Sequence, residues 1–326
     1  NIEKIIYDDN LYYRNRMEFI SIFSGMKLKF GMYKKGSKDK VHIENCVLCS
    51  EKMILLKEKI EKKINTSHLK IEEKKKITHL VIRENNSNEN MIIIMLSKKS
   101  HALIKFFESI KNEFEKCSFV IGLNNYKKLV LAGEIMYSST DKPFIQEVDK
   151  YEYTIHPFSF FQNNKFLLKN MIYEISELIE NGKELLELYC GNGFFSIPFS
   201  KKFEKIISVE NSPGSIDSLK NNLELNDINN VFPIESDVFD FLSGNEKKYE
   251  NIFIDPPRMG CKNLVENISK KVEKNIYYLS CNPSMLAKDL NRLIEEGFEI
   301  KNIIIFDLFP NTYHIESFVK LSRELS

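Results

Sequence analysis

The chain has 326 residues, of which 43% are hydrophobic and 29% charged, a balance typical of a globular protein with room for two domains. No apolar stretch approaches the roughly 20 residues that cross a bilayer, so a membrane-spanning protein is excluded and no membrane partner is expected. Six cysteines in a chain of this length do not form a disulfide framework, which favours a reducing cytoplasm. We expect a cytoplasmic monomer.

Charge is divided unevenly along the chain. Residues 1–150 hold 28 Lys and Arg against 20 Asp and Glu, a net charge of +8, whereas residues 151–326 hold 19 against 26, a net charge of −7. A basic half is typical of a domain that contacts a polyanion. An AT-rich genome would also enrich lysine, but it would act on both halves, so the difference favours polyanion contact.

The first half alternates short strands with two amphipathic helices. The predicted strands are 13–21, 27–33, 41–45, 77–83, 91–96, 118–123 and 128–132, and the predicted helices are 51–65 and 103–114. This order predicts an α+β domain over residues 1–155. Its basic segments at 34–40 and 57–63 are candidates for phosphate contacts.

From about residue 156 the pattern changes to regular alternation. The predicted strands are 184–189, 205–210, one near 231, 251–254, 276–279 and 300–306, and the predicted helices are 164–180, 215–226 and 284–295. Such alternation predicts a doubly wound, mainly parallel, Rossmann-like α/β domain over residues 156–326. Sheets of this kind bind ligands beyond the carboxyl ends of their strands.

The first strand of the second half ends in a glycine-containing loop, ELYCGNG at residues 187–193. Glycine lets a backbone approach a ligand without a Cβ clash, although a tight turn with no ligand would look the same. Glu210 ends the next strand, where a carboxylate can accept hydrogen bonds from ribose hydroxyls. Asp237 follows the strand after that and is placed to reach an adenine amino group. The dinucleotide fingerprint lacks its third glycine, which favours S-adenosylmethionine over a dinucleotide.

Three later segments supply a thiol and two carboxylates. Cys281 ends an apolar run in SCNP, Asp255 begins DPPR after another strand, and Glu316 ends the segment HIE. A thiolate that adds to carbon 6 of a pyrimidine makes carbon 5 nucleophilic, and a base must later remove the proton from carbon 5. Cys281 precedes the predicted helix 284–295, whose N-terminus favours a thiolate. A buried structural cysteine is the alternative.

Together these motifs resemble the S-adenosylmethionine-dependent RNA uracil-C5 methyltransferases, which make 5-methyluridine in transfer RNA and 23S ribosomal RNA. The matching segments are FSFFQNN at 158–164, LELYCGNG at 186–193, DPPR at 255–258, SCNP at 280–283 and HIE at 314–316, with YRNRMEF at 13–19 and GMYKKGS at 31–37. The resemblance therefore covers nearly the whole chain and implies a structured RNA partner.

The resemblance also implies roles for individual residues. By it, Cys281 is the nucleophile, Glu316 is the proton acceptor, and Asp255 lies beside the target base. The positions that would contact S-adenosylmethionine are Gln162, Tyr189, Gly191, Gly193, Glu210, Asp237 and Asp255. Some members carry Asn where this chain has Phe194.

Many members of this family also hold an iron–sulfur centre through four cysteines. Only Cys46 matches such a ligand, so we expect no cluster and no other metal in this chain. The segments at 31–46 and 321–323 look more like the ribosomal and archaeal members, which favours 23S rRNA slightly over the T-loop of tRNA.

Two other functions remain open from the sequence. Exocyclic-amine methyltransferases also place acid-Pro-Pro after a strand, but an aromatic residue usually follows, where this chain has Arg258. They need neither Cys281 nor Glu316. An inactive RNA-binding or RNA-folding factor is the non-enzyme alternative, and the intact thiol and carboxylate argue against it.

Overall fold

The computed structural model describes residues 1–124, 133–261 and 264–323, and the predicted strand 128–132 lies outside them. The chain forms two compact units, one of residues 1–9 and 147–326 and the other of residues 10–146. The division thus falls nine residues before the predicted boundary at 155. The first residues belong to the larger unit because β1 (Lys4–Ile6) pairs with its sheet.

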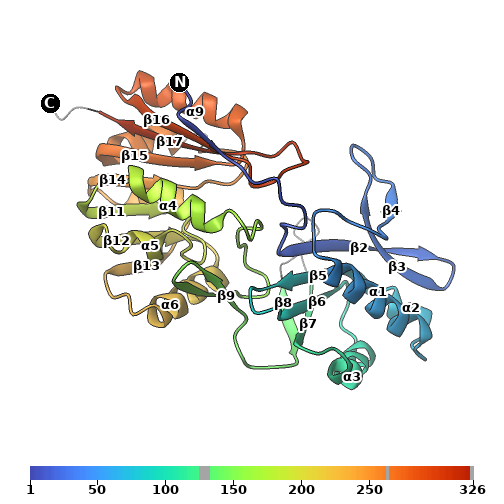
Figure 1. Ribbon diagram of the computed structural model, residues 1–326. Coiled ribbons are helices and arrows are strands. Elements are labelled where there is room, and N and C mark those ends of the chain that lie inside the picture. The colour runs from blue at the N-terminus through green and yellow to red at the C-terminus, as the bar shows by residue number, and fades with distance from the viewer. Residues whose placement is uncertain (125–132, 262–263, 324–326) are drawn as a thin grey trace. The chain divides into compact units, whose positions relative to one another are not determined.

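The larger unit contains an eight-stranded sheet in the order β1-β16-β17-β15-β14-β11-β12-β13 (Figure 1). Its other strands are β11 (Gly182–Leu188), β12 (Phe203–Glu210), β13 (Val231–Glu235), β14 (Tyr249–Ile254), β15 (Val272–Ser280), β16 (Glu299–Phe306) and β17 (Glu316–Ser322). Neighbouring strands are parallel except that β17 runs antiparallel to both β15 and β16. This confirms the predicted Rossmann-like α/β fold.

Helices pack on this sheet through alternate strand residues. They are α4 (Leu168–Leu178), α5 (Ser196–Phe199), α6 (Pro213–Leu225), α7 (Val238–Gly244), α8 (Val265–Lys271) and α9 (Pro283–Glu295). On one face, Leu186 and Leu188 of β11 join a core with apolar residues of α7, α8 and α9. Because successive strand residues point to opposite faces, Leu185 and Glu187 point to the other face.

The smaller unit is a seven-stranded, mainly antiparallel sheet in the order β4-β3-β2-β5-β6-β7-β8 (Figure 1). Its strands are β2 (Arg16–Ser24), β3 (Lys27–Tyr33), β4 (Lys40–His42), β5 (Ile77–Glu84), β6 (Asn90–Leu96), β7 (Cys117–Leu123) and β8 (Glu134–Ser138). Its helices are α1 (Glu51–Thr66), α2 (Ile71–Lys74), α3 (His101–Ile110) and the short 3-10 helix η1 (Lys111–Glu113). A short pair, β9 (Ile145–Val148) and β10 (Tyr151–Thr154), completes the strands of the described residues.

The helices of the smaller unit cover one face of its sheet. Apolar residues of α1 and α3, among them Ile60 and Phe107, share one core with Ile92 and Ile94 of β6. Lys57 in the predicted basic segment 57–63 is fully buried and pairs with Glu61 at 2.9 Å, so it is a structural residue and cannot contact RNA. No helix among the described residues is long and apolar enough to cross a membrane.

Candidate active site

The strand order of the larger unit brings the predicted site residues together along one edge of the sheet, at the carboxyl ends of its parallel strands. Parallel strands β12, β11, β14 and β15 all end there, and antiparallel β17 begins there. The edge therefore carries Glu210, the glycine loop, Asp255, Cys281 and Glu316, in that order across the sheet. The strand order reverses between β11 and β14, which is where open α/β sheets bind ligands.

Cys281 stands between the end of β15 and the start of α9. Asn282 caps this helix, since its side-chain oxygen accepts a hydrogen bond from the Met285 N–H at 3.3 Å, and Pro283 occupies the first turn. Burial raises the pKa of the Cys281 thiol, and Glu316 and Asp255 raise it further, while Arg258 lowers it. The net pKa lies above its ordinary value because burial and two carboxylates outweigh the favourable charges, and the effect of the helix N-terminus on the thiolate stays a prediction.

Asp255 follows β14 and is hydrogen-bonded to the neighbouring strand, β11. Its backbone N–H donates to the Leu188 carbonyl of β11 at 3.4 Å. Burial raises the pKa of Asp255 to about 7, and nearby Glu187 contributes. Glu187 itself is buried in the sheet and accepts hydrogen bonds from the hydroxyls of Ser196 and Ser208, the latter at 2.8 Å. Burial raises the pKa of Glu187 to about 7 as well, against the effect of both hydroxyls.

Glu316 is the first residue of β17 and is buried. Burial raises its pKa well above the usual range, Asp255 raises it further, and Arg258 opposes both. The Arg258 guanidinium also lies 3.3 Å from His314 Nε2, two residues before Glu316. One cation, Arg258, thus lowers the pKa of both the thiol and the carboxyl group.

The loop that carries Arg258 is fastened to α9. The Asn282 side-chain nitrogen donates to the Arg258 carbonyl at 2.9 Å. Farther along the helix, Asp289 Oδ2 accepts hydrogen bonds from the Cys261 N–H at 2.8 Å and from the Tyr278 hydroxyl at 2.7 Å. These contacts fix the loop after Asp255 relative to the helix that starts beside Cys281.

The glycine loop after β11 is held by α6. Gly193 has φ of +86°, and a Cβ added there would lie 2.3 Å from Leu219 Cδ1, so this position requires glycine. The Asn222 side chain donates to the Asn192 carbonyl at 2.9 Å. Glu210 closes the loop from the β12 side, since its carboxylate accepts the Gly191 N–H at 3.2 Å and the Ser212 N–H at 2.9 Å.

The remaining predicted contacts lie around this loop. Tyr189 begins it with φ of +63°, and Gln162 is buried in the larger unit. Asp237 is exposed and caps α7, with Oδ1 accepting the Phe239 N–H at 2.8 Å. Some uracil-C5 methyltransferases have Asn at the position of Phe194. In this chain Phe194 is buried among the rings of Tyr153, Phe161 and Phe195, so its side chain stabilises the loop by packing beneath it.

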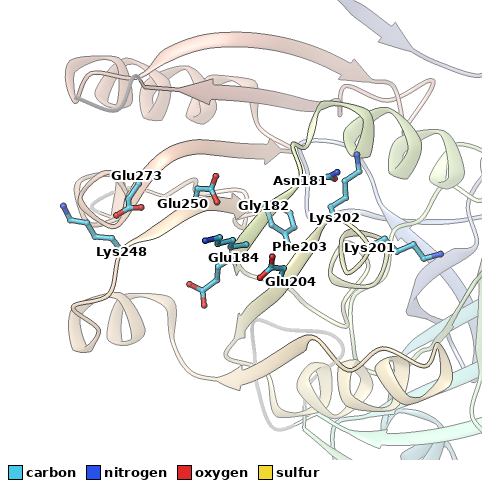
Figure 2. Close-up of a pocket in the computed structure, with 11 residues that line it drawn as sticks. Asn181, Gly182, Glu184, Lys201, Lys202, Phe203, Glu204, Lys248, Glu250 and Glu273 are labelled. Carbon is cyan, nitrogen blue, oxygen red and sulfur yellow. The ribbon is translucent and has the colours of Figure 1, made fainter.

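An open cavity of about 920 Å³ lies at the opposite edge of the same sheet, where its parallel strands begin (Figure 2). Gly182 and Phe203, at the starts of β11 and β12, line it together with charged residues such as Glu184 and Lys248. Glu184 is paired with Lys247 at 2.5 Å. The amino ends of the strands carry none of the predicted site residues, which places the candidate active site at the other edge.

A sequence profile of the tRNA (uracil-5-)-methyltransferase family matches residues 2–324. The chain belongs to this family. It is accordingly an RNA uracil-C5 methyltransferase, as its motifs predicted.

Individual relatives give a similar result. The tRNA/tmRNA (uracil-C(5))-methyltransferase of Campylobacter concisus is 28% identical over 96% of this chain and 86% of its own length. The 23S rRNA (uracil(747)-C(5))-methyltransferase of Pyrococcus horikoshii is 28% identical over 96% of this chain and 74% of its own length. The Pyrococcus abyssi tRNA (uracil-54, C5)-methyltransferase, solved with S-adenosyl-L-homocysteine, covers 98% of this chain and 78% of its own with 23% identity and a TM-score of 0.78, which shows a shared fold.

Sequence reasoning missed two features of this methyltransferase site. One is β17, which was not predicted although the alternation in ESFVKLS is a strand signal. The other is Glu187, whose signal was a carboxylate within the apolar run LLEL on a buried strand. Among the described residues, no group of three or more His, Cys, Asp or Glu side chains is arranged to hold a metal ion.

Proposed function

We propose that the chain methylates carbon 5 of a specific uridine in structured RNA, with Cys281 as nucleophile and Glu316 as the base that removes the carbon 5 proton. The observation that carries this proposal is the position of the two residues at the ends of adjacent strands. Ser280 of β15 pairs with Ser317 of β17, and Cys281 directly follows Ser280 while Glu316 directly precedes Ser317, which supports a shared site.

S-adenosylmethionine is the proposed methyl donor, and when bound it supplies a methyl group on a positively charged sulfur that leaves as a neutral thioether. The glycine loop fits such a ligand. A Cβ at Gly191 would meet nothing within 4 Å, and the buried Asn192 amide nitrogen has no hydrogen-bond partner among the described residues. Gln162, Tyr189, Gly193, Glu210, Asp237 and Asp255 are the other proposed contacts.

The chain's own groups then act in a fixed order. The Cys281 thiolate adds to carbon 6, and the electron pair of the carbon 5–carbon 6 double bond moves towards carbon 5 and the adjacent carbonyl. Once carbon 5 carries the methyl group, Glu316 takes its proton and the carbon 6–sulfur bond breaks, which restores the double bond and the thiolate. Asp255 and Arg258 hold the edge of the uracil ring and balance the charge near it.

The raised pKa values of Cys281 and Glu316 are consistent with a site that becomes active only when the target uridine is bound. Burial disfavours the charged form of Glu316, which raises its pKa while no nucleobase is bound. Arg258 favours the ionised forms of both Cys281 and Glu316, so its loop, which α9 holds in place, supports the thiolate and the base.

A tritium-release assay tests the proposal. RNA from a strain that lacks the gene is labelled with tritium at carbon 5 of uridine and incubated with the enzyme and methyl-labelled S-adenosylmethionine. Methylation at carbon 5 should release one tritium for each methyl group incorporated. An exocyclic-amine methyltransferase would incorporate methyl without release, and an inactive RNA-folding factor would do neither.

We propose 23S rRNA rather than tRNA as the substrate, on the likeness of residues 31–46 and 321–323 to ribosomal members. The two relatives described above act on different RNAs at the same identity, so they do not decide the choice. Nucleoside mapping of both RNAs from the deletion strain tests it. Loss of 5-methyluridine from tRNA alone would reject the ribosomal assignment.

A further inference from the structure

The loop between β16 and β17, residues 307–315, carries an exposed aromatic side chain close to the proposed base. Tyr313 is 75% exposed and stands three residues before Glu316 in the chain. Three residues span at most about 11 Å, so the Tyr313 backbone lies near the point where Glu316 begins β17. The proposed mechanism uses no group of Tyr313.

Hydrogen bonds within the loop fix the position of this tyrosine. The N–H and the hydroxyl of Thr312 both donate to the Phe309 carbonyl, at 3.0 and 2.7 Å, and the same hydroxyl accepts the His314 N–H at 3.2 Å. The loop is also fastened to the segment before α4, because the Asn164 side chain donates to the carbonyl of buried Leu308 at 3.0 Å. A side chain on a turn that is already ordered costs less free energy to hold against a partner.

The Tyr313 ring belongs to a small cluster of flat groups. Its centre lies 4.1 Å from that of the His314 ring, with 43° between the two planes. Arg258 Nη2 lies 3.4 Å from Nδ1 and 3.3 Å from Nε2 of His314, so the segment after β14 also holds the imidazole. The Phe309 ring meets His314 edge-on, with 6.0 Å between the ring centres. These contacts orient Tyr313 while most of its surface stays open to solvent.

Two more large apolar side chains are exposed on the segments that contact this loop. Met259 is 56% exposed and follows Arg258, and Phe160 is 59% exposed and lies four residues before Asn164. Apolar side chains exposed singly are normal on a protein surface, whereas several around one site indicate a surface that a partner covers. The cation of Arg258 among them favours a partner that combines flat apolar groups with negative charge.

Single-stranded RNA has this combination, since the faces of its bases stack on aromatic side chains and each nucleotide carries a phosphate. A uridine that reaches Cys281 must leave its stack, which deprives the neighbouring base of a stacking partner. We propose that the Tyr313 ring stacks on a nucleobase adjacent to the target uridine and replaces the lost contact, with His314 positioning the ring. Tyr313 is then a positioning residue for the substrate. The inference rests on the proposed function in that it takes RNA as the substrate.

Kinetics of the full chain with RNA from the deletion strain test this inference. Tyr313→Ala should reduce kcat/KM for RNA about 5- to 150-fold, which is the effect of losing one base–aromatic stack. Tyr313→Phe keeps the ring and should restore nearly all of this loss. Tyr313→Ala should leave the thermal midpoint and the KM for S-adenosylmethionine unchanged. Tyr173→Ala, at an exposed tyrosine of α4, is the matched control and should keep the wild-type kcat/KM.

A fluorescent base reports the stacking without turnover. The probe is an oligoribonucleotide of nine uridines and one central 2-aminopurine, whose emission falls when its ring stacks on another ring. It is added, without S-adenosylmethionine, to proteins that carry Cys281→Ala. The emission should fall on binding to Cys281→Ala alone and to the protein with Tyr313→Phe added, and should fall much less with Tyr313→Ala added.

Four results would overturn the inference. A loss in Tyr313→Phe as large as that in Tyr313→Ala would assign the role to the hydroxyl group, and a wild-type kcat/KM in Tyr313→Ala would make the ring a solvated surface. A lower thermal midpoint in Tyr313→Ala with unchanged quenching would make the ring structural, and an absence of quenching by Cys281→Ala would exclude stacking. Because quenching requires no methyl transfer, quenching that depends on Tyr313 would stand even if the tritium-release assay rejected the catalytic proposal.

Discussion

Cys281 and Glu316 lie where strand β15 ends and the antiparallel strand β17 begins. The β15–β17 ladder has Ser280 opposite Ser317, and one further step along both strands reaches the thiol-bearing and carboxylate-bearing residues. Glu316 is opposite Phe306 in the β16 ladder, which fixes its position from that side. The relationship depends on strand register, since a one-residue slip would send Glu316 to the other face of the sheet.

Replacing the nucleophile should abolish the reaction without abolishing cofactor binding. Cys281→Ala should lose methyl transfer to below about 1% of the wild-type rate, because carbon 5 is not activated without the thiol. S-adenosylmethionine affinity, measured by calorimetry, should change less than twofold. Cys190→Ala and Cys261→Ala remove buried thiols whose pKa burial raises, and both should remain active. Substantial turnover by Cys281→Ala would reject the mechanism.

Replacing the base should trap an intermediate. Glu316→Gln keeps the shape of the side chain and removes its basicity, so carbon 5 can be methylated but its proton cannot leave. A covalent protein–RNA species that carries the label of S-adenosylmethionine should accumulate and survive denaturation on a gel. Adding Cys281→Ala should erase that band. Normal turnover, or a stalled enzyme with no band, would assign the base to another group.

Glu187 should make the protein less stable as pH rises through the slightly acidic range. Its folded pKa of about 7 lies above the unfolded value of 4.5, so the folded state binds more protons between these values. The contribution of Glu187 to the free energy of unfolding should therefore be largest below pH 4.5. It should decline by at most about 1.4 kcal/mol per pH unit up to pH 7.

Urea unfolding of Glu187→Gln between pH 4.5 and 8 checks this sign. The decline should become smaller, both because Glu187 no longer titrates and because its charge no longer raises the pKa of Asp255. Glu204→Gln, at an exposed carboxylate on neighbouring β12, should keep the wild-type slope. An unchanged slope in Glu187→Gln would show that this carboxyl is not protonated by burial.

The hairpin of β3 and β4 should contribute to RNA affinity. Lys34, Lys35, Lys38 and Lys40 are all exposed there. Changing all four to Gln should weaken RNA binding and flatten its salt dependence, because fewer counterions are released, and should leave S-adenosylmethionine affinity unaltered. Four exposed lysines of the larger unit give a charge-matched control, namely Lys183, Lys201, Lys220 and Lys270. An RNA-binding salt slope equal to wild type would make the hairpin a solvated surface only.

The sequence by itself determined the fold class and most of the site. Alternating strand and helix periodicity predicted the parallel sheet, and the segments around Asp255 and Cys281 lie at strand ends, as expected. These features are local, because apolar spacing, prolines and caps act within a few residues of one another. The same locality explains why the helices 51–65 and 284–295 were predicted within two residues of their ends.

Only the tertiary structure decided how the chemical groups meet. The sequence did not predict β17, so it could not show that Glu316 begins an antiparallel strand beside Cys281. Nor could it give the direction of the thiol pKa, which depends on burial and on carboxylates 26 and 35 residues away in the chain. Such terms come from pairing between distant segments, and a single sequence carries no direct record of that pairing. The setting of Tyr313 became visible for the same reason, because it requires the contact of Arg258 with His314 and that of Asn164 with Leu308.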